Sequence, residues 1–371
     1  MSYAEMEKLS SSVAFSVNQN FDTQLRRLTQ SQCFNCVMDR SAYEIQFDDS
    51  GMCNFCHGAQ DALHQIAKER HKLWDVVRDI KESRKDKYDC IIGLSGGVDS
   101  STLLHQAVAL GLHPLCFTLD NGWNDPKADE NIMNLVETLE VPLYRYTIDL
   151  PKFKRLQAAF IQAGVKNIEI PTDHVIMAAT YELASKYKIK YILSGGNVVT
   201  ESIMPPSWGH NARDLVHIKA IYKQFAHKSL SGLPVCSTWK WNWYRWIKGI
   251  KVVYLLDYLD YNREDAIKTL EAKFAYKPYG EKHCESTFTW WFQNFYLFEK
   301  FGIDKRKAHF SSLINSGQMT RAEALEALGG TFEYPKIGLE ERAMKYERHE
   351  HSDYPMDPWY DRIASVVRKF T

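Results

Sequence analysis

The sequence predicts an α/β protein with a doubly wound, mainly parallel sheet, an N-terminal four-cysteine knuckle and a helical C-terminal region. Three observations lead to this fold class. Short apolar runs alternate with amphipathic stretches from Tyr88 to Leu193, two C-x-x-C pairs precede them, and the chain after about Ser202 has mainly helical periodicity. Apolar runs that alternate with helical stretches are typical of parallel strands joined by crossover helices.

The chain is long enough for two or three folded units, because 371 residues exceed the length of a typical domain. We expect a flexible N-terminal arm, a knuckle with a linking helix, a nucleotide-binding domain that carries the sheet, and a mainly helical substrate or partner region. The boundaries expected for these regions are 1–30, 31–86, 87–201 and 202–371.

The composition excludes several classes of protein. The 46 Lys and Arg residues balance the 46 Asp and Glu residues, so no overall basic charge attracts nucleic acid or an anionic membrane. No apolar run approaches the roughly 18 residues of a membrane span, and Glu5, Glu7 and Lys8 stand where a signal peptide needs its apolar region. We therefore expect a cytoplasmic protein that neither spans a membrane nor binds nucleic acid.

The two C-x-x-C pairs are separated by sixteen residues and consist of Cys33, Cys36, Cys53 and Cys56. Four thiolates in two knuckles supply tetrahedral sulfur ligation, and a closed set of four ligands leaves no position for a substrate. We expect a structural zinc site. A redox pair or an iron–sulfur cluster is the alternative. Cys90 and Cys116, which lie in apolar runs, are expected to fill the core.

Four strands and four helices are expected in the nucleotide-binding domain. The strands are expected at residues 88–94, 113–119, 142–148 and 190–193, and the helices at 100–110, 127–139, 153–163 and 173–187. Right-handed crossovers then bring the carboxyl ends of the strands to one edge of the sheet, where doubly wound proteins bind ligands.

The strongest local signal joins the first strand to the first helix of this domain. It comprises Leu94, Ser95, Gly96, Gly97, Val98, Asp99, Ser100 and Ser101. The glycines let the backbone turn tightly, and the hydroxyls and the helix N-terminus can bind a phosphate. The lysine of a Walker A loop is absent. The segment therefore predicts an anion-binding loop; a plain Ser/Gly loop that caps a helix is the alternative.

Polar residues also follow the other strands. Asp120 follows the second strand, Pro171 to His174 open a helix, and Gly195, Asn197 and Glu201 follow the fourth strand. Each segment is expected at the ligand-binding edge of the sheet. A simple Asn-Gly turn after Asp120 and a helix-dipole role for Asp173 are the alternatives.

The C-terminal half is rich in aromatic residues. Five of the ten tryptophans fall between Trp208 and Trp246. Trp239, Trp241 and Trp243 alternate, which favours one face of a strand. Core packing is the main interpretation of these aromatics, and a ligand platform or a partner surface is the alternative.

Thr320 and Glu323 have the spacing of a capping box, and the tail 334–358 is expected to be extended.

The SGGVDSS segment resembles the PP-loop of the ATP pyrophosphatase superfamily, whose members split ATP into AMP and pyrophosphate. Together with CFNC…CNFC and GEKHCESTFTWWFQNFY…KFGIDKRKAH, it makes the chain similar to the N-acetyl sugar amidotransferases of the WbpG/PseA-like family. The resemblance implies ATP binding by residues 94–101 with Asp120, Gly195 and Asn197, and magnesium binding by Asp99 and Glu201. It implies catalytic roles for Asp99, Lys282, His283 and Glu285.

The same resemblance implies a reaction and its partners. An acetamido group of a nucleotide-linked sugar would become an acetamidino group through an O-adenylyl intermediate, in the biosynthesis of surface polysaccharide such as O-antigen. Ammonia would come from a separate HisH-like glutaminase and a HisF-like barrel protein. Lys282, His283, Arg245, Lys305 and Arg306 are candidates for binding the sugar diphosphate. A tRNA-modifying PP-loop enzyme and a non-catalytic nucleotide-binding subunit are the alternatives.

Overall fold

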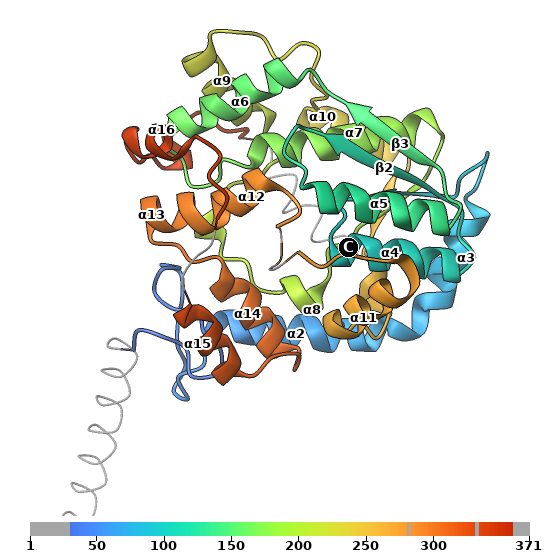
Figure 1. Ribbon diagram of the computed structural model, residues 1–371, viewed down its shortest axis with the longest axis horizontal. Coiled ribbons are helices and arrows are strands. Elements are labelled where there is room, and N and C mark those ends of the chain that lie inside the picture. Colours follow the sequence, from blue (N-terminus) through green and yellow to red (C-terminus); the bar gives the residue numbers. More distant parts are fainter. Residues whose placement is uncertain (1–29, 280–281, 283, 331–333, 359–371) are drawn as a thin grey trace, which may run out of the picture.

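The computed structural model describes residues 30–279, 282, 284–330 and 334–358 (Figure 1). Its five strands form one sheet in the order β3-β2-β1-β4-β5, and all four neighbouring pairs are parallel. The strands are β1 (Cys90–Gly93), β2 (Pro114–Asp120), β3 (Leu143–Thr147), β4 (Tyr191–Leu193) and β5 (Lys251–Val253). The predicted fold class is confirmed, and the four expected strands lie within about two residues of their expected bounds.

Helices cover both faces of the sheet because the strand residues alternate between them. Ile92 packs on the face that carries α4, α5 and α11, and Ile91 packs on the face that carries α7. The helices are α4 (Val98–Ala109), α5 (Pro126–Thr138), α6 (Leu150–Ala163), α7 (Ile170–Lys186) and α11 (Arg263–Phe274). This arrangement leaves the carboxyl ends of the strands open for a site.

After β4, one strand was not expected and one local expectation is wrong. Residues 251–253 form β5, which pairs Val252 with Ile192 and extends the sheet beyond the expected strands. Three residues are too few to show a period, so only the pairing with β4 defines this strand. The segment with alternating tryptophans is helical: α10 (Thr238–Asn242) continues as a π-helix (Trp243–Ile247). Ser237 starts it by accepting a hydrogen bond from the backbone N–H of Lys240.

The remaining helices lie N-terminal and C-terminal to the four expected strands. Those before the sheet are α2 (Asn54–Glu69) and α3 (Leu73–Glu82). Those after β4 are α8 (Val198–Glu201), α9 (Leu215–Ala226), α12 (Thr287–Trp291), α13 (Leu297–Phe301), α14 (Arg306–Asn315), α15 (Arg321–Gly329) and α16 (Glu340–Lys345). A π-helix (Phe292–Tyr296) joins α12 to α13. The tail was expected to be extended, but α16 forms one short helix within it.

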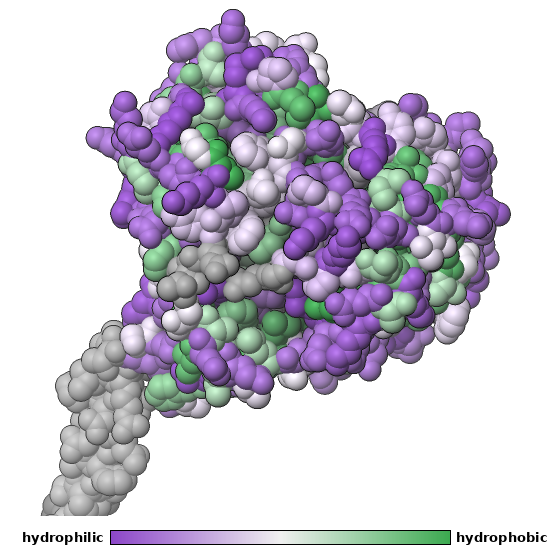
Figure 2. Space-filling model, viewed as in Figure 1, coloured by the Kyte–Doolittle hydropathy of each residue, from purple (hydrophilic) through white to green (hydrophobic). Residues whose placement is uncertain are grey.

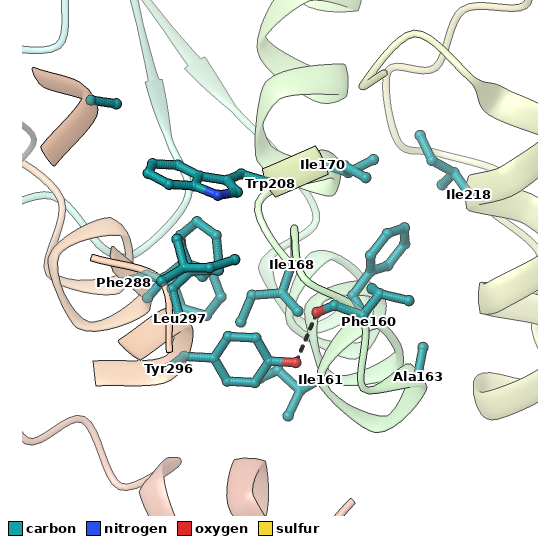
Figure 3. Close-up of a cluster of buried hydrophobic side chains, with 14 of the residues drawn as sticks. Phe160, Ile161, Ala163, Ile168, Ile170, Trp208, Ile218, Phe288, Tyr296 and Leu297 are labelled. Atoms are coloured by element: carbon teal, nitrogen blue, oxygen red, sulfur yellow. Dashed lines mark hydrogen bonds between the residues drawn. The ribbon is translucent and has the colours of Figure 1, made fainter. Parts of the chain in front are cut away.

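A large aromatic cluster attaches the C-terminal helices to the sheet region (Figure 3). Phe288, Tyr296 and Leu297 pack against Phe160 and Ile168, and all five are at most 1% exposed. The Tyr296 hydroxyl donates to the Val165 carbonyl at 2.9 Å. Burying side chains of this size contributes about 2–3 kcal/mol each. The cluster therefore fixes α12 and α13, and α12 carries part of the site described below.

The surface in Figure 2 is mostly hydrophilic, with small separate hydrophobic areas. None of the described helices is both long enough and apolar enough to cross a lipid bilayer.

The capping box at the start of α15 is confirmed. The Thr320 hydroxyl accepts from the Glu323 backbone N–H at 3.2 Å, and the Glu323 carboxylate accepts from the Thr320 backbone N–H at 2.8 Å.

We expect Thr320→Ala to lower the free energy of unfolding by about 1 kcal/mol, because helix N–H groups lose their partner. Denaturant unfolding measures this. Thr269→Ala, at a half-buried position inside α11, is the control and should cost nothing, since alanine favours helix. An equal loss in both variants would contradict the capping role.

Candidate active site

The anion-binding loop lies between β1 and α4, as its sequence predicts. Gly96 has a φ of +81°, and a Cβ atom added to it would lie 2.4 Å from the Ala128 carbonyl oxygen of α5. Only glycine fits both constraints. The Ser95 hydroxyl accepts from the Gly97 backbone N–H at 3.2 Å and lies 3.2 Å from the Ser100 hydroxyl. The first N–H groups of α4 have no partner within the helix, so the loop can bind an anion.

Two adjacent cavities open beside this loop. The smaller, about 240 Å³, lies between the loop and residues of α8 and α11. The larger, about 680 Å³, lies between the ends of β1 and β2, the start of α7 and helices α12 and α14. Ser95, Glu201, Lys282 and Glu285 line both cavities. These four residues therefore stand where the two cavities meet.

Lys282 joins the two carboxylates that were assigned to magnesium. Its Nζ lies 2.7 Å from Glu201 Oε1 and 3.1 Å from Asp99 Oδ2, and it donates to the Thr200 hydroxyl at 3.0 Å. Burial alone lowers the pKa of Lys282, but the attraction of Asp99 and Glu201 outweighs it and holds the pKa above its ordinary value. Asp99 and Glu201 thus lie close enough together to share one cation.

Two tyrosines that no motif indicated, buried Tyr261 and half-buried Tyr279, also contact the loop. The Tyr261 hydroxyl donates to Asp99, and the Tyr279 hydroxyl donates to the Gly96 carbonyl at 2.6 Å. Burial raises the pKa of both phenols, and the negative charges of Asp99 and Glu285 respectively raise it further. Both phenols are therefore neutral hydrogen-bond donors. They fix Asp99 and the backbone of the loop from residues far along the chain.

Glu285 brings the family-like C-terminal stretch to the loop. A Cβ atom on Gly97 would lie 3.2 Å from Glu285 Oε1, so the carboxyl group packs directly on the loop. Its backbone carbonyl accepts from the Asp125 N–H at 2.9 Å, which fixes the segment next to α5. Burial raises the pKa of Glu285. Together with Lys282, it makes the C-terminal half part of the same site as the anion-binding loop.

The larger cavity contains a pair of carboxyl groups at the start of α7. Glu169 is 8% exposed and accepts from the Thr289 hydroxyl at 2.6 Å. Burial, with repulsion from Asp173, raises the pKa of Glu169 to about 8. Burial also raises the pKa of Asp173 to about 6, although Lys305 opposes this shift. Asp173 is surrounded by protein, but its carboxyl group reaches the solvent in the cavity. No motif indicated Glu169.

His309 gives the larger cavity a neutral imidazole. Its Nδ1 lies 3.3 Å from the Thr200 carbonyl oxygen, which can only accept, so Nδ1 carries the proton and Nε2 is an acceptor. Burial and the charges of Lys282 and Arg263 lower the pKa of His309 to about 3. The residue lies in the KAH part of the family-like stretch, but it had not been assigned a role.

The pKa of Glu169 predicts a pH dependence of stability. The folded protein keeps the Glu169 proton up to about pH 8, whereas the unfolded chain loses it near 4.5. The folded state therefore loses stability as the pH rises between these values. Glu169→Gln keeps an acceptor for Thr289 and cannot ionise. We expect the melting temperature of the variant, relative to wild type, to be higher at pH 9 than at pH 5.

Thermal unfolding at the two pH values measures this difference. Glu264→Gln, an exposed change in α11, is the matched control and should show no such trend. If Glu169→Gln changed the melting temperature by the same amount at pH 5 and pH 9, the raised pKa of Glu169 would be contradicted.

The predicted site residues divide into those that line one of the two cavities and those that line neither. Those that line a cavity are Leu94, Ser95, Gly97, Val98, Asp99, Ser100, Gly195, Glu201, Lys282, Glu285 and Lys305. Asp120, Asn197, Ser101, Arg245 and Arg306 line neither cavity. Gly96 also lines neither cavity, although its carbonyl accepts from Tyr279. His283 lies outside the described residues.

Three of the residues that line neither cavity, Asp120, Asn197 and Arg306, have local partners. Asp120 accepts from the Gly122 backbone N–H at 3.0 Å, and Asn197 caps α8 by accepting from the Thr200 N–H at 2.9 Å. Arg306 is buried in an ion pair with Asp304 at 2.9 Å. A buried arginine with a carboxylate partner is held in place and is not available to a diphosphate.

The four cysteines of the two knuckles form one buried group. Cys33 Sγ lies 3.9 Å from Cys56 Sγ, Cys36 Sγ lies 3.8 Å from Cys53 Sγ, and all four atoms lie within 4.8 Å of one another. Zinc–sulfur bonds of about 2.3 Å in a tetrahedron require sulfur atoms about 3.8 Å apart, whereas a disulfide requires about 2 Å. The group can therefore hold a metal ion. Cys90 and Cys116 are buried in β1 and β2, as expected.

A family model described as the C-terminal domain of WbpG-like LPS biosynthesis proteins matches residues 285–346. Residues 285–346 are similar to this domain, and we call them the WbpG-like domain. The matched segment begins at Glu285, which packs on the anion-binding loop, and it includes α12 to α15 and the cavity residue His309. The WbpG-like domain therefore forms one wall of the candidate active site.

The similarity of the chain to other known proteins is more distant. An uncharacterized protein of Methanocaldococcus jannaschii is 24% identical over 169 residues, which are 44% of this chain and 58% of that protein. The chain thus spans little more than half the length of this relative. The NMN synthetase from Francisella tularensis is 16% identical with a TM-score of 0.31, covering 59% of this chain and 98% of its own. The NH3-dependent NAD synthetase from Campylobacter jejuni is 14% identical with a TM-score of 0.29, covering 58% and 99%.

Proposed function

We propose that this protein is an ATP-dependent amidotransferase that converts an acetamido group of a nucleotide-linked sugar into an acetamidino group. One observation carries the proposal. Glu285, the first residue of the WbpG-like domain, packs on the anion-binding loop, and Lys282, three residues before it, pairs with Asp99 and Glu201. A phosphate-binding loop and a segment typical of a polysaccharide-biosynthesis family thus share one site.

The smaller cavity and the loop would bind the phosphates of ATP. The N–H groups at the start of α4, with Ser95 and Ser100, suit the pyrophosphate part. Asp99 and Glu201 are the residues that would hold Mg²⁺, since two adjacent carboxylates with phosphate oxygens suit a hard cation. Magnesium would offset the negative charge of the phosphate oxygens. Lys282, already between these carboxylates, would add a second positive charge near the leaving pyrophosphate.

The larger cavity would hold the acetamido sugar. Its volume of about 680 Å³ is typical of small-molecule sites. Asp173, Lys305, Gln293 and His309 provide polar groups for hydroxyl and amide contacts. The amide oxygen would attack the α-phosphorus of ATP, and pyrophosphate would leave. Ammonia would then attack the amide carbon; a C–N bond forms, the C–O bond breaks, and the oxygen leaves with AMP.

The reaction needs ammonia and must exclude water, which would hydrolyse the activated amide. We propose that a HisH-like glutaminase and a HisF-like barrel protein supply the ammonia in the cytoplasm during O-antigen synthesis. Glutamine should support turnover only when these partners are added. Efficient use of glutamine by this chain alone would contradict the proposal.

We also propose that the four-cysteine group holds zinc in a purely structural role, because no position among the four sulfur atoms is left for a substrate. The proposal also keeps the expected regions, with boundaries at residues 30, 86 and 201. In it the knuckle region supports the WbpG-like domain, and residues 87–201 provide most of the ATP site.

The decisive experiment incubates the purified chain with ATP, Mg²⁺, ammonium and a panel of acetamido nucleotide-sugars. AMP, pyrophosphate and the mass of the sugar are followed together. Coupled release of AMP and replacement of one sugar oxygen by NH are expected. AMP formation that requires RNA would favour the tRNA-modifying alternative, and the absence of AMP with every acceptor would favour a nucleotide-binding subunit.

A further inference from the structure

The helix that begins at α10 exposes an unusual set of large apolar side chains. Trp239 is 81% exposed, Trp243 42%, Trp246 62% and Ile247 73%. Their spacing of four, three and one residues places them on one side of the helix. We call these four residues the tryptophan face. Apolar side chains this exposed and this close together mark an interaction surface more often than an ordinary protein surface.

The opposite side of the same helix is firmly packed. Trp241 and Tyr244 are 4% and 3% exposed and belong to the core cluster that includes residues of α7. Trp241 packs edge-on against Tyr181 and His174 of α7, with ring centroids 5.1 Å and 5.9 Å apart. Figure 1 shows α10 beside α7. The tryptophan face is therefore presented by a fixed helix and does not result from loose packing.

The stretch of sequence that carries the tryptophan face is rich in positive charge. Residues 234–253 contain Lys240, Arg245, Lys248 and Lys251 and no Asp or Glu. Lys240 pairs with Glu182 at 2.9 Å. Among the described residues, none of the other three forms an ion pair, and the Lys248 ammonium instead lies 4.8 Å from the ring centre of Trp243. The balanced charge of the whole chain thus conceals a local basic surface.

We propose that the tryptophan face and its cations dock this protein on the surface of an anionic lipid bilayer. Tryptophan rings partition into the headgroup region, and lysine and arginine bind lipid phosphates while their stems lie along apolar surface. The centres of protein–protein interfaces are enriched in tryptophan but depleted of lysine. Here two of the three cations on the helix and its C-cap, Lys240 and Lys248, are lysines, which favours a lipid surface over a protein. Docking of this kind needs no membrane-spanning helix.

Sedimentation with lipid vesicles tests the proposal on the purified full chain. Vesicles of phosphatidylcholine with one-third phosphatidylglycerol should sediment the protein at low salt, and pure phosphatidylcholine should not. High salt should release it. Trp239→Ala with Trp246→Ala should weaken binding at least tenfold, and Arg245→Gln or Lys248→Gln about fivefold each. Tryptophan fluorescence should shift to the blue on binding in wild type.

The chain offers a matched control for the tryptophan variants. Trp74, on α3, is 66% exposed, so Trp74→Ala removes an equally exposed ring from another surface and should leave binding unchanged. Thermal unfolding of each variant checks that the fold is intact.

Several results would overturn the proposal. They are no sedimentation at low salt, equal binding to neutral vesicles, and a loss with Trp74→Ala as large as with the face variants. Dimer formation or RNA binding that depends on the tryptophan face, without vesicle binding, would assign the face to a protein or RNA partner instead.

Discussion

Asp99→Asn is expected to reduce AMP formation at least 100-fold. The substitution keeps an oxygen that can accept from the Tyr261 hydroxyl, so the side chain should stay in place. It removes the charge that faces Lys282 at 3.1 Å and with it one of the two carboxylates proposed to hold magnesium. Losing one preorganised charge contact at a phosphoryl-transfer site costs about 3–4 kcal/mol of transition-state stabilisation. A loss of this size lowers the rate by a factor of roughly 100 or more.

The measurement is AMP release at saturating ATP across a series of Mg²⁺ concentrations, with the acceptor sugar identified by the panel. The apparent affinity for Mg²⁺ should also fall in the variant. Asp260→Asn is the matched control, because Asp260 lies next to Tyr261 in the sequence and its side chain is 97% exposed. Wild-type AMP formation by Asp99→Asn would remove Asp99 from the mechanism, whatever the activity with other acceptors.

The anion-binding loop could be predicted from the sequence because its signal is local. Gly96 and Gly97 are adjacent, the serines flank them, and a strand and a helix stand on either side. Each of these features acts within a few residues, so no knowledge of the tertiary fold is needed. The capping box at Thr320 was predictable for the same reason. The spacing of the two C-x-x-C pairs predicted a metal site, although only the fold shows that the four sulfur atoms converge.

The partners of the loop could not be predicted in the same way. Tyr261 is separated from Asp99 by 162 positions, and Tyr279 from Gly96 by 183. Neither tyrosine belongs to a motif, and the chain has 20 tyrosines. Lys282 and Glu285 were found only because a family-like stretch contains them, and their contacts with Asp99 and Gly97 come from the fold.

Burial explains the remaining differences between expectation and structure. Glu169 is an ordinary acid in the sequence, and its raised pKa arises because α12 and α7 enclose it. The alternating tryptophans predicted a strand, but a period of two over five residues also occurs by chance in a helix whose exposed side is apolar. The tryptophan face breaks the usual pattern of polar surface and apolar core, so patterning alone misassigned it.

Cys53→Ser is expected to abolish the zinc binding proposed for the four-cysteine group and to lower the melting temperature of the protein by more than 10 °C. The four-cysteine group connects distant parts of the chain. Arg321, at the start of α15, donates to the Cys33 and Cys36 carbonyls at 3.2 and 3.1 Å, and Asn315 of α14 donates to Cys56 Sγ at 3.4 Å. Structural zinc contributes about 10 kcal/mol or more in small zinc-binding peptides, so even part of that value is a large share of a domain's stability.

Metal content by mass spectrometry and thermal unfolding with and without a chelator measure this effect. Cys116→Ala is the matched control: it removes a buried thiol from β2 and should lower the melting temperature moderately while zinc stays stoichiometric.

Because α14 and α15 belong to the WbpG-like domain, loss of zinc should also loosen the helices that line the larger cavity. Hydrogen exchange in α14 should therefore accelerate in Cys53→Ser and not in Cys116→Ala. Full metal content in Cys53→Ser, or equal exchange in both variants, would show that the group does not support the site through a metal.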